Sequence, residues 1–265
     1  MDKRPALTRP KFWALALAMV AGFCALTLAA SAGSAGAATP SATSSPSATS
    51  SPSATPTASP TSSPTASPGA SASPFDVDSA SSLTVVVNKI RPLKPVKYHP
   101  AAFGSFNLAK PASDALVKMR AAMAKAGAGD LVLASGYRGY FTQKSIYARN
   151  LVRLGTKGAQ RLTAMPGYSE HQTGLAADLA AAGQGCRIYV CFAETKAGKW
   201  LAKNSWQFGF ILRYPNGATK ITGYQYEPWH FRFVGTELAK AMHLAKATVL
   251  ESYLNLPAAP DYLTK

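Results

Sequence analysis

The sequence predicts a domain of the α+β class, because its expected helices and strands are mixed without a regular βαβ alternation. Residues 75–265 have the length of one compact domain with a core of its own. Residues 39–74 are almost only Ser, Thr, Ala, Pro and Gly, and cannot bury enough apolar surface to fold. The three cysteines are too few for a disulfide-built miniprotein or a Cys-rich zinc module.

The elements expected first along the domain follow from local sequence signals. Residues 83–87 are a β-branched run that predicts a strand, and the prolines after it keep the next stretch extended. Ser113 is the expected N-cap of a helix that continues to about Ala126 with an apolar face. Residues 131–135 indicate a short buried strand.

The second half of the domain continues the same mixture. We expect a strand around Asp178 and a last helix that Thr236 caps and that continues to Val249. The other elements expected here are a helix after Tyr140, a helix over residues 193–205, and strands over residues 209–213 and 229–234.

The first 38 residues contain the parts of a secretory signal. Four basic residues precede an uncharged run over residues 12–30, and Ala35-Gly36-Ala37 supplies a cleavage site of the A-x-A type. We therefore expect a bacterial protein that is secreted or held at the cell surface. The apolar run is close to the length that spans a bilayer, so an uncleaved anchor stays open as an alternative. Residues 39–74 would then be an extended linker, whose glycosylation the sequence does not decide.

The charge of the folded part points to an anionic partner. Residues 75–265 contain 24 of the 28 basic residues and 11 of the 12 acidic ones, which gives a net charge of +13. Export and the lack of interleaved aromatic and basic residues argue against nucleic acid. An anionic cell wall or a carboxylate-bearing substrate fits better, although the charge can also serve solubility alone.

Three short segments contain the candidate chemistry. His171, Asp178 and His230 offer two imidazoles and a carboxylate, a donor set suited to zinc with a fourth position left for water. Glu227 is a candidate general base for that water, and Arg138 a candidate group to hold negative charge on the attacked carbonyl. Each of these residues alone is more often structural. We interpret His99 and His243 as structural, because neither has such neighbours in the sequence.

The spacing of these residues sets a condition. On an uninterrupted strand, residues three or seven apart point to opposite faces, so neither Glu227 with His230 nor His171 with Asp178 would converge. Gly174 and Pro228 lie within these intervals and can break the alternation, so we expect the chain to bend there.

The same segments carry a resemblance to a known family. The stretch from about Leu83 to Gly235 is similar to the zinc D-alanyl-D-alanine carboxypeptidases of VanY type, in the wider group that includes lysostaphin and the sonic hedgehog signalling domain. No motif position is missing, although residues 179–185 are unusually rich in Ala and Gly. The matching motifs are Val86-Val87-Asn88-Lys89 with Arg91-Pro92-Leu93, Ser135-Gly136-Tyr137-Arg138 with Gln143, Pro166 through Asp178, and Glu227-Pro228-Trp229-His230.

The resemblance implies a role for each site residue. It implies one zinc ion held by His171, Asp178 and His230 on a central antiparallel sheet flanked by helices. It implies Glu227 as the general base and Arg138 as the residue that steadies the carbonyl. Ser169 and Gln143 match positions that look like substrate-binding residues.

Cys186 and Cys191 are expected to form a disulfide. Export gives them an oxidising environment, and the alternation over residues 187–190 is compatible with a hairpin. A second metal site is the poorer interpretation, since no histidine stands nearby.

The sequence therefore predicts a monomeric, exported zinc D,D-carboxypeptidase that removes the C-terminal D-alanine of peptidoglycan stem peptides. A D,D-dipeptidase and an endopeptidase that cuts cross-links are alternatives, because the same zinc chemistry serves all three. A non-catalytic, zinc-containing wall-binding module is an alternative from another class.

Overall fold

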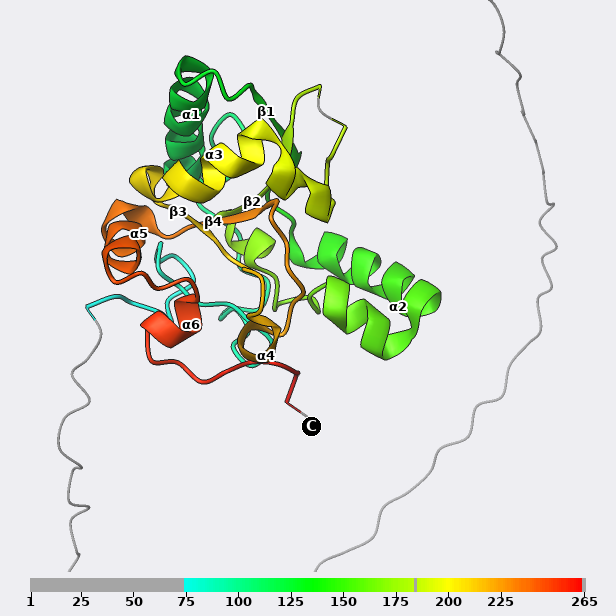
Figure 1. Cartoon of the computed structure of the whole chain (residues 1–265). Coiled ribbons are helices and arrows are strands. Elements are labelled where there is room, and N and C mark those ends of the chain that lie inside the picture. The colour runs from blue at the N-terminus through cyan, green and yellow to red at the C-terminus, as the bar shows by residue number, and fades with distance from the viewer. Residues whose placement is uncertain (1–73, 184, 264–265) are drawn as a thin grey trace, which may run out of the picture. The chain divides into compact units, whose positions relative to one another are not determined.

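A four-stranded antiparallel sheet lies at the centre of the computed structural model, which describes residues 74–183 and 185–263 (Figure 1). The strand order is β1-β2-β4-β3, so the chain adds β4 between β2 and β3. The strands are β1 (Leu131–Ser135), β2 (Ala176–Ala181), β3 (Phe210–Leu212) and β4 (His230–Phe233). The expected α+β class is confirmed.

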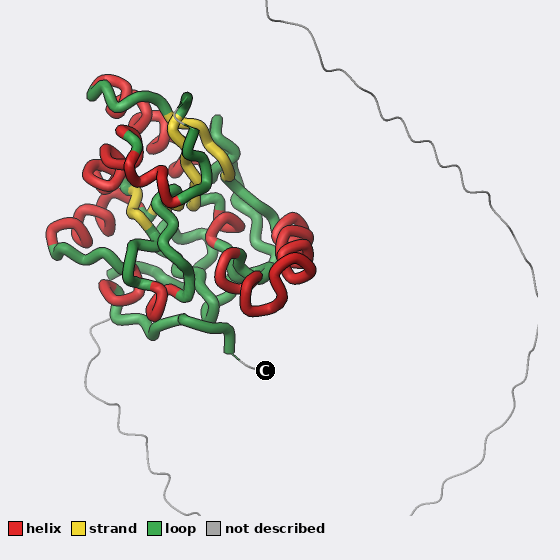
Figure 2. Tube along the Cα trace, turned by 45° about the vertical axis from the view of Figure 1, so that its right-hand side comes forward, coloured by secondary structure: helices red, strands yellow, loops and turns green. Residues whose placement is uncertain are grey.

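Helices surround this sheet, as the helical segments around the central strands in Figure 2 show. None of the helices within residues 74–183 and 185–263 is both long and apolar enough to cross a bilayer. The expected signal segment and all of the linker except Pro74 lie outside the described residues. The helices are α1 (Lys110–Lys125), α2 (Tyr140–Leu162), α3 (Lys196–Asn204), α4 (Thr219–Thr222), α5 (Gly235–Leu244) and α6 (Leu250–Tyr253), with 3-10 turns η1 (Glu170–Thr173), η2 (Val190–Glu194) and η3 (Ser205–Phe208).

The two faces of the sheet have different side chains because strand residues alternate. Ala177, Leu179, Phe231 and Phe233 belong to the main hydrophobic core. The apolar faces of α1 and α3 belong to the same core. The alternate residues of β2 and β4, which include Asp178, are therefore left for the opposite face.

The expected strand over residues 83–87 is wrong, although Val85, Val86 and Val87 are buried. Arginine side chains, in place of a neighbouring strand, donate to three of its carbonyl groups. Arg232 donates to the oxygens of Leu83 and Val85, and Arg91 donates to Val86. A β-branched run thus predicts burial, but whether its backbone pairs with a strand depends on side chains far along the chain.

Two expected helix starts are also wrong. The first helix begins three residues before Ser113, with Pro111 in its first turn, where a missing N–H costs nothing. Ser113 lies inside this helix on its buried face. Thr236 lies inside α5, which starts at Gly235, and α5 ends at Leu244 instead of continuing to Val249. The strands expected over residues 131–135, 209–213 and 229–234 are confirmed to within two residues at each end.

Helix α2 reverses its direction at Gly155. Gly155 has φ 66° and ψ 177°, a conformation that glycine reaches without steric cost. As a result α2 consists of two helical segments that lie side by side in Figures 1 and 2. This reversal brings the end of α2 back to its first segment, where Asn150 donates to Oγ1 of Thr163.

Candidate metal centre

Asp178 and His230 lie directly opposite each other on neighbouring strands. They are paired in the register of β2 and β4, and Ser135 of β1 pairs with Asp178 on its other side. His171 comes from η1, just before β2. One ligand atom from each of His171, Asp178 and His230 lies within 4.8 Å of the others, and all three residues are buried. The structure thus brings together the three residues expected to hold a metal.

The chain bends at both expected places. Gly174 ends η1 in the left-handed conformation, φ 71°, and a Cβ there would lie 2.9 Å from the backbone nitrogen of Ala109. The segment before β4 turns as well, because the amide of His230 donates to the carbonyl oxygen of Glu227 at 3.1 Å. These turns place residues of uneven spacing on one side of the sheet.

Each histidine has one ring nitrogen toward the centre and the other toward a fixed acceptor. Nδ1 of His171 donates to the carbonyl oxygen of Gly136 at 2.8 Å, while its Nε2 lies 3.2 Å from Asp178. Nε2 of His230 donates to Glu170 at 3.3 Å, while its Nδ1 lies 3.0 Å from Asp178. Acceptors of this kind orient metal-binding imidazoles and fix their tautomers. The donor set and its outer contacts therefore fit zinc.

The charges of the cluster are strongly coupled. Burial opposes ionisation of Asp178, but His171 and His230 outweigh it and hold the pKa of Asp178 below its ordinary value. Burial works to lower the pKa of His230, but its hydrogen bonds to Asp178 and Glu170 raise that pKa to about 9. Because a ligand imidazole has to give up its proton, metal binding at this cluster should release a proton.

Glu227 and Arg138 flank this cluster. Burial raises the pKa of the Glu227 carboxyl to about 7, against the attraction of His230, from which it lies 3.8 Å away. A carboxyl with such a pKa can accept and return a proton near neutral pH. Burial also lowers the pKa of Arg138, and Nε of Arg138 has no hydrogen-bond partner among the described residues. Both side chains line the same pocket as the metal cluster.

Glu170 is the main site residue that sequence reasoning missed. Its carboxylate is fully buried and accepts from Arg213 at 2.8 Å, from Arg232 at 3.0 Å and from His230. Arg213 is held in turn by Glu251, also fully buried. Two arginines outweigh burial and keep the pKa of Glu170 well below its ordinary range. Its place beside His171 in the motif was the available signal, but its partners lie more than 40 residues away.

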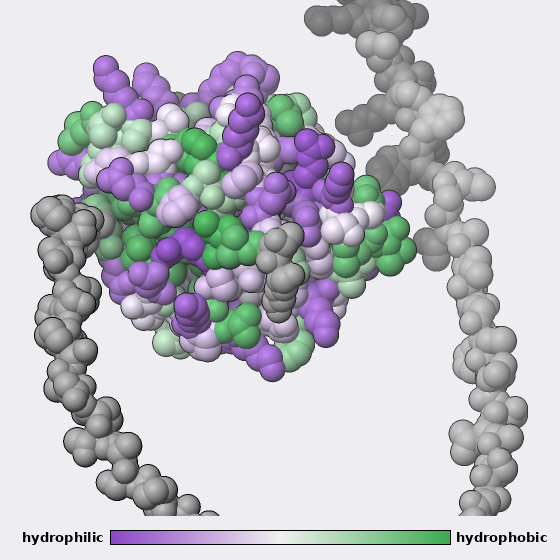
Figure 3. All heavy atoms as spheres, turned by 90° about the horizontal axis from the view of Figure 1, so that it is seen from below, coloured by the Kyte–Doolittle hydropathy of each residue, from purple (hydrophilic) through white to green (hydrophobic). Residues whose placement is uncertain are grey.

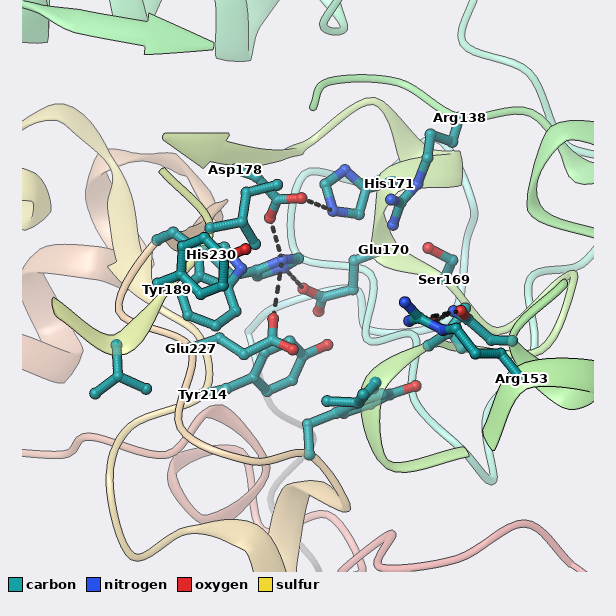
Figure 4. A pocket seen from close by; sticks show the side chains of 18 residues that line it. Arg138, Arg153, Ser169, Glu170, His171, Asp178, Tyr189, Tyr214, Glu227 and His230 are labelled. Carbon is teal, nitrogen blue, oxygen red and sulfur yellow. Dashed lines mark hydrogen bonds and ion pairs between the residues drawn. The ribbon is translucent and has the colours of Figure 1, made fainter. Parts of the chain in front are cut away.

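The cluster lies in a pocket of about 640 Å³ (Figure 4). Ser169 lines this pocket, as expected for a substrate-binding residue. Gln143 does not line it, because its side chain is fully buried and donates to the carbonyl oxygen of Ala164 at 2.7 Å. Ala164 itself lines the pocket, so the structure places Gln143 behind the wall. The other lining residues are Arg138, Asn150, Arg153, Leu162, Thr163, Glu170, His171, Asp178, Ile188, Tyr189, Val190, Tyr214, Tyr224, Glu227, Trp229 and His230.

Cys186 and Cys191 form a disulfide that closes a short loop at the pocket rim. Residues 187–190 do not form the expected hairpin, because η2 begins at Val190 and Phe192 donates to Tyr189 in a turn. His99 and His243 lie outside the pocket, and each packs against aromatic rings, His99 on Phe103 and Tyr137 and His243 on Trp206.

Comparisons with known proteins agree with this geometry. The family model VanY, described as D-alanyl-D-alanine carboxypeptidase, matches residues 105–236. A D-alanyl-D-alanine carboxypeptidase of Enterococcus faecalis is 40% identical over 133 residues, which are 47% of this chain and 47% of that protein. The chain spans about half, or less, of the length of the first curated relatives that it matches.

Two solved structures are similar over most of their own length. The LdcB LD-carboxypeptidase is 36% identical with a TM-score of 0.61, over 66% of this chain and 87% of that one. A mutant of the vancomycin resistance D,D-pentapeptidase VanY in complex with Zn(II) is 35% identical with a TM-score of 0.56, over 66% of this chain and 99% of that one.

Proposed function

Because the chain belongs to the VanY family of D-alanyl-D-alanine carboxypeptidases, we propose that it is a zinc peptidase that releases the C-terminal D-alanine of peptidoglycan stem peptides. The observation that carries this proposal is the convergence of His171, Asp178 and His230 in one pocket with Glu227 and Arg138. A related solved structure contains D-alanine-D-alanine, which supports the substrate class.

Each pocket residue has a defined task in this proposal. His171, Asp178 and His230 hold zinc, which supplies Lewis-acid activation of water and of the scissile carbonyl. Glu227 takes a proton from the attacking water and passes it to the amine of the leaving D-alanine. Arg138 stabilises the negative charge that develops on the carbonyl oxygen.

The residues outside the metal cluster shape the pocket. Ser169 lines the pocket and is available to bind the peptide, whereas Gln143 acts through the wall by holding the carbonyl oxygen of Ala164. Gln143 would then shape the pocket without contacting the substrate itself.

An L,D-carboxypeptidase that acts on tetrapeptide stems is a second candidate. The LdcB LD-carboxypeptidase has a higher TM-score than the VanY mutant, 0.61 against 0.56. Both reactions release a terminal D-alanine and differ in the residue before it, so the same catalytic groups serve either one.

We further propose export to the cell wall, with residues 1–38 as a signal peptide or anchor and residues 39–74 as a spacer. A net charge of +13 over residues 75–265 suits an anionic wall and free carboxylates. We expect a monomer. Sedimentation of the purified domain and N-terminal sequencing of the exported protein test these points.

Digestion of defined peptides by the zinc-loaded domain tests the reaction. The set contains a pentapeptide stem, a tetrapeptide stem, the free dipeptide and a cross-linked stem, with products identified by mass. Release of D-alanine from the pentapeptide supports the proposal, and release from the tetrapeptide alone favours the second candidate. Cleavage of the dipeptide or of cross-links would favour a dipeptidase or an endopeptidase.

Glu227→Gln separates catalysis from zinc retention. It should keep zinc and lose about 10²–10⁴-fold in kcat, because the proton acceptor is removed while the metal ligands stay. An unchanged rate would show that the base is assigned wrongly. A parent domain that holds zinc, binds cell walls and cleaves no D-configured peptide would instead be a non-catalytic module.

A further inference from the structure

The pocket has two residues with a permanent positive charge among the described residues that line it, Arg138 and Arg153. A carboxypeptidase substrate brings two needs for positive charge. The reacting carbonyl oxygen becomes negative, and the leaving residue carries a free carboxylate. The two arginines lie on different elements, so each need can be assigned separately.

Arg138 belongs to the metal end of the pocket. Its backbone amide donates to the carbonyl oxygen of His171, and its guanidinium interacts electrostatically with Asp178 and Glu227. This position suits the reacting carbonyl. The terminal carboxylate is therefore left for Arg153.

Arg153 lies on the wall that α2 forms, on the side of the pocket near Ser169 (Figure 4). Its Nη2 donates to Oδ1 of Asn150 at 3.2 Å, and Asn150 donates to Thr163 at 2.5 Å. Within the described residues, Arg153 forms no ion pair with a carboxylate. It therefore offers an oriented guanidinium, with donors left for a bidentate contact to an incoming carboxylate.

The opposite rim has a different character. Ile188, Tyr189 and Val190 of the disulfide-closed loop line the pocket there, and Tyr189 is 69% exposed. These side chains offer apolar surface to a peptide and no charge to a carboxylate. On the side of α2, by contrast, the surface carries hydrophilic as well as hydrophobic side chains. Figure 3 shows this on its right-hand side, where Figure 1 places α2.

We propose that Arg153 binds the free C-terminal carboxylate of the substrate and makes the pocket select free chain ends. The proposal rests on the proposed function and names the residue that makes the enzyme a carboxypeptidase. One residue beyond the scissile bond spans about 3.8 Å, so the group that holds its carboxylate has to line the same pocket as the metal ligands. A cross-linked or amidated end lacks this carboxylate and loses the contact.

The test compares two substrates that differ only at the chain end, a D-alanine carboxylate and its carboxamide. The measured quantity is the ratio of their kcat/KM values. The parent should prefer the carboxylate, and Arg153→Gln should lower that ratio about tenfold, the effect of one charge-assisted hydrogen-bonded contact. Arg153→Lys should lose part of the preference, because it keeps the charge without the planar fork.

Arg149→Gln is the matched control. Arg149 lies one turn earlier on α2, is exposed, and does not line the pocket. Its replacement removes the same charge from the same helix and should leave the ratio unchanged. Raising the salt concentration should lower the preference of the parent and not that of Arg153→Gln, since the contact is exposed to screening.

The outcomes are distinct. A parent that prefers the carboxylate and an Arg153→Gln variant with the same preference would overturn the inference and show that another group binds the carboxylate. A parent without preference, or an equal loss in Arg149→Gln, would also overturn it. A folded, zinc-loaded parent that cleaves neither substrate would reject the proposed function, and the inference would fall with it.

Discussion

Replacement of Glu170 by glutamine should weaken zinc binding, although Glu170 lies outside the cluster of His171, Asp178 and His230. Glu170 accepts from His230 at 3.3 Å, and its other oxygen accepts from Arg213 and Arg232. The amide introduced by Glu170→Gln would turn one acceptor into a donor and remove the charge between two buried guanidinium groups. Loss of an acceptor behind a metal-binding imidazole typically weakens metal affinity about 10–100-fold. That range corresponds to about 1.4–2.7 kcal/mol of binding free energy.

The same substitution should destabilise the fold. Breaking a buried ion pair from one side costs about 3–5 kcal/mol, because the remaining charge stays buried. Glu251→Gln is the control, since Glu251 pairs with the same Arg213, is also fully buried, and accepts from Arg213 and Asn88 rather than from His230. It should lose comparable stability and keep the zinc affinity of the parent.

Competition with a chromophoric chelator measures the zinc affinity of the three proteins, and urea unfolding measures their stability. Zinc should raise the melting temperature of Glu170→Gln less than that of Glu251→Gln, because stabilisation by a ligand follows its affinity. Equal zinc affinities in the two folded variants would refute the reasoning and leave Glu170 a structural role only. If Glu170→Gln does not fold, Glu170→Asp replaces it in the comparison with Glu251→Gln. The shorter aspartate keeps the negative charge but holds it farther from His230.

The buried ion pair of Glu251 and the disulfide loop can be tested in the same way. Burial alone would raise the pKa of Glu251, but Arg213 outweighs burial and lowers that pKa below 4.5. The stability that this carboxylate contributes is therefore complete above about pH 4.5. It is lost as the pH falls through the lower pKa of the folded state. Urea unfolding between pH 7 and 3 should therefore show a shallower loss of stability on acidification in Glu251→Gln than in the parent, and parallel curves would contradict this. The double substitution Cys186→Ser with Cys191→Ser should cost roughly 2 kcal/mol of stability, as expected for a small closed loop. It should raise KM more than it lowers kcat, because the loop lines the pocket and contributes no residue to the metal cluster. A drop in kcat with unchanged KM would show that the loop acts on the chemistry instead.

The residues of the metal cluster could be recognised from the sequence because their types limit their chemistry. Two histidines and an aspartate within short motifs suit few tasks other than metal binding, and Glu227 precedes one of them closely. The bends at Gly174 and Pro228 could also be anticipated, since only an interrupted alternation lets such spacings converge. Gln143 shows the limit of this reasoning, because a polar residue in a motif can support a wall as well as line it.

Sequence alone determined the class of the fold, most of its strands, the ligand types and the charge of the domain, because these depend on local pattern and on side-chain chemistry. The tertiary structure decided everything that depends on partners distant along the chain. It made the run over residues 83–87 a segment held by Arg232, since a carbonyl accepts equally well from a guanidinium and from a strand. It placed Glu170 behind His230, and through the reversal of α2 at Gly155 it returned Leu162 and Thr163 to the pocket that Arg153 also lines. Such contacts join residues tens of positions apart, and no local periodicity encodes which of the many buried or charged side chains will meet.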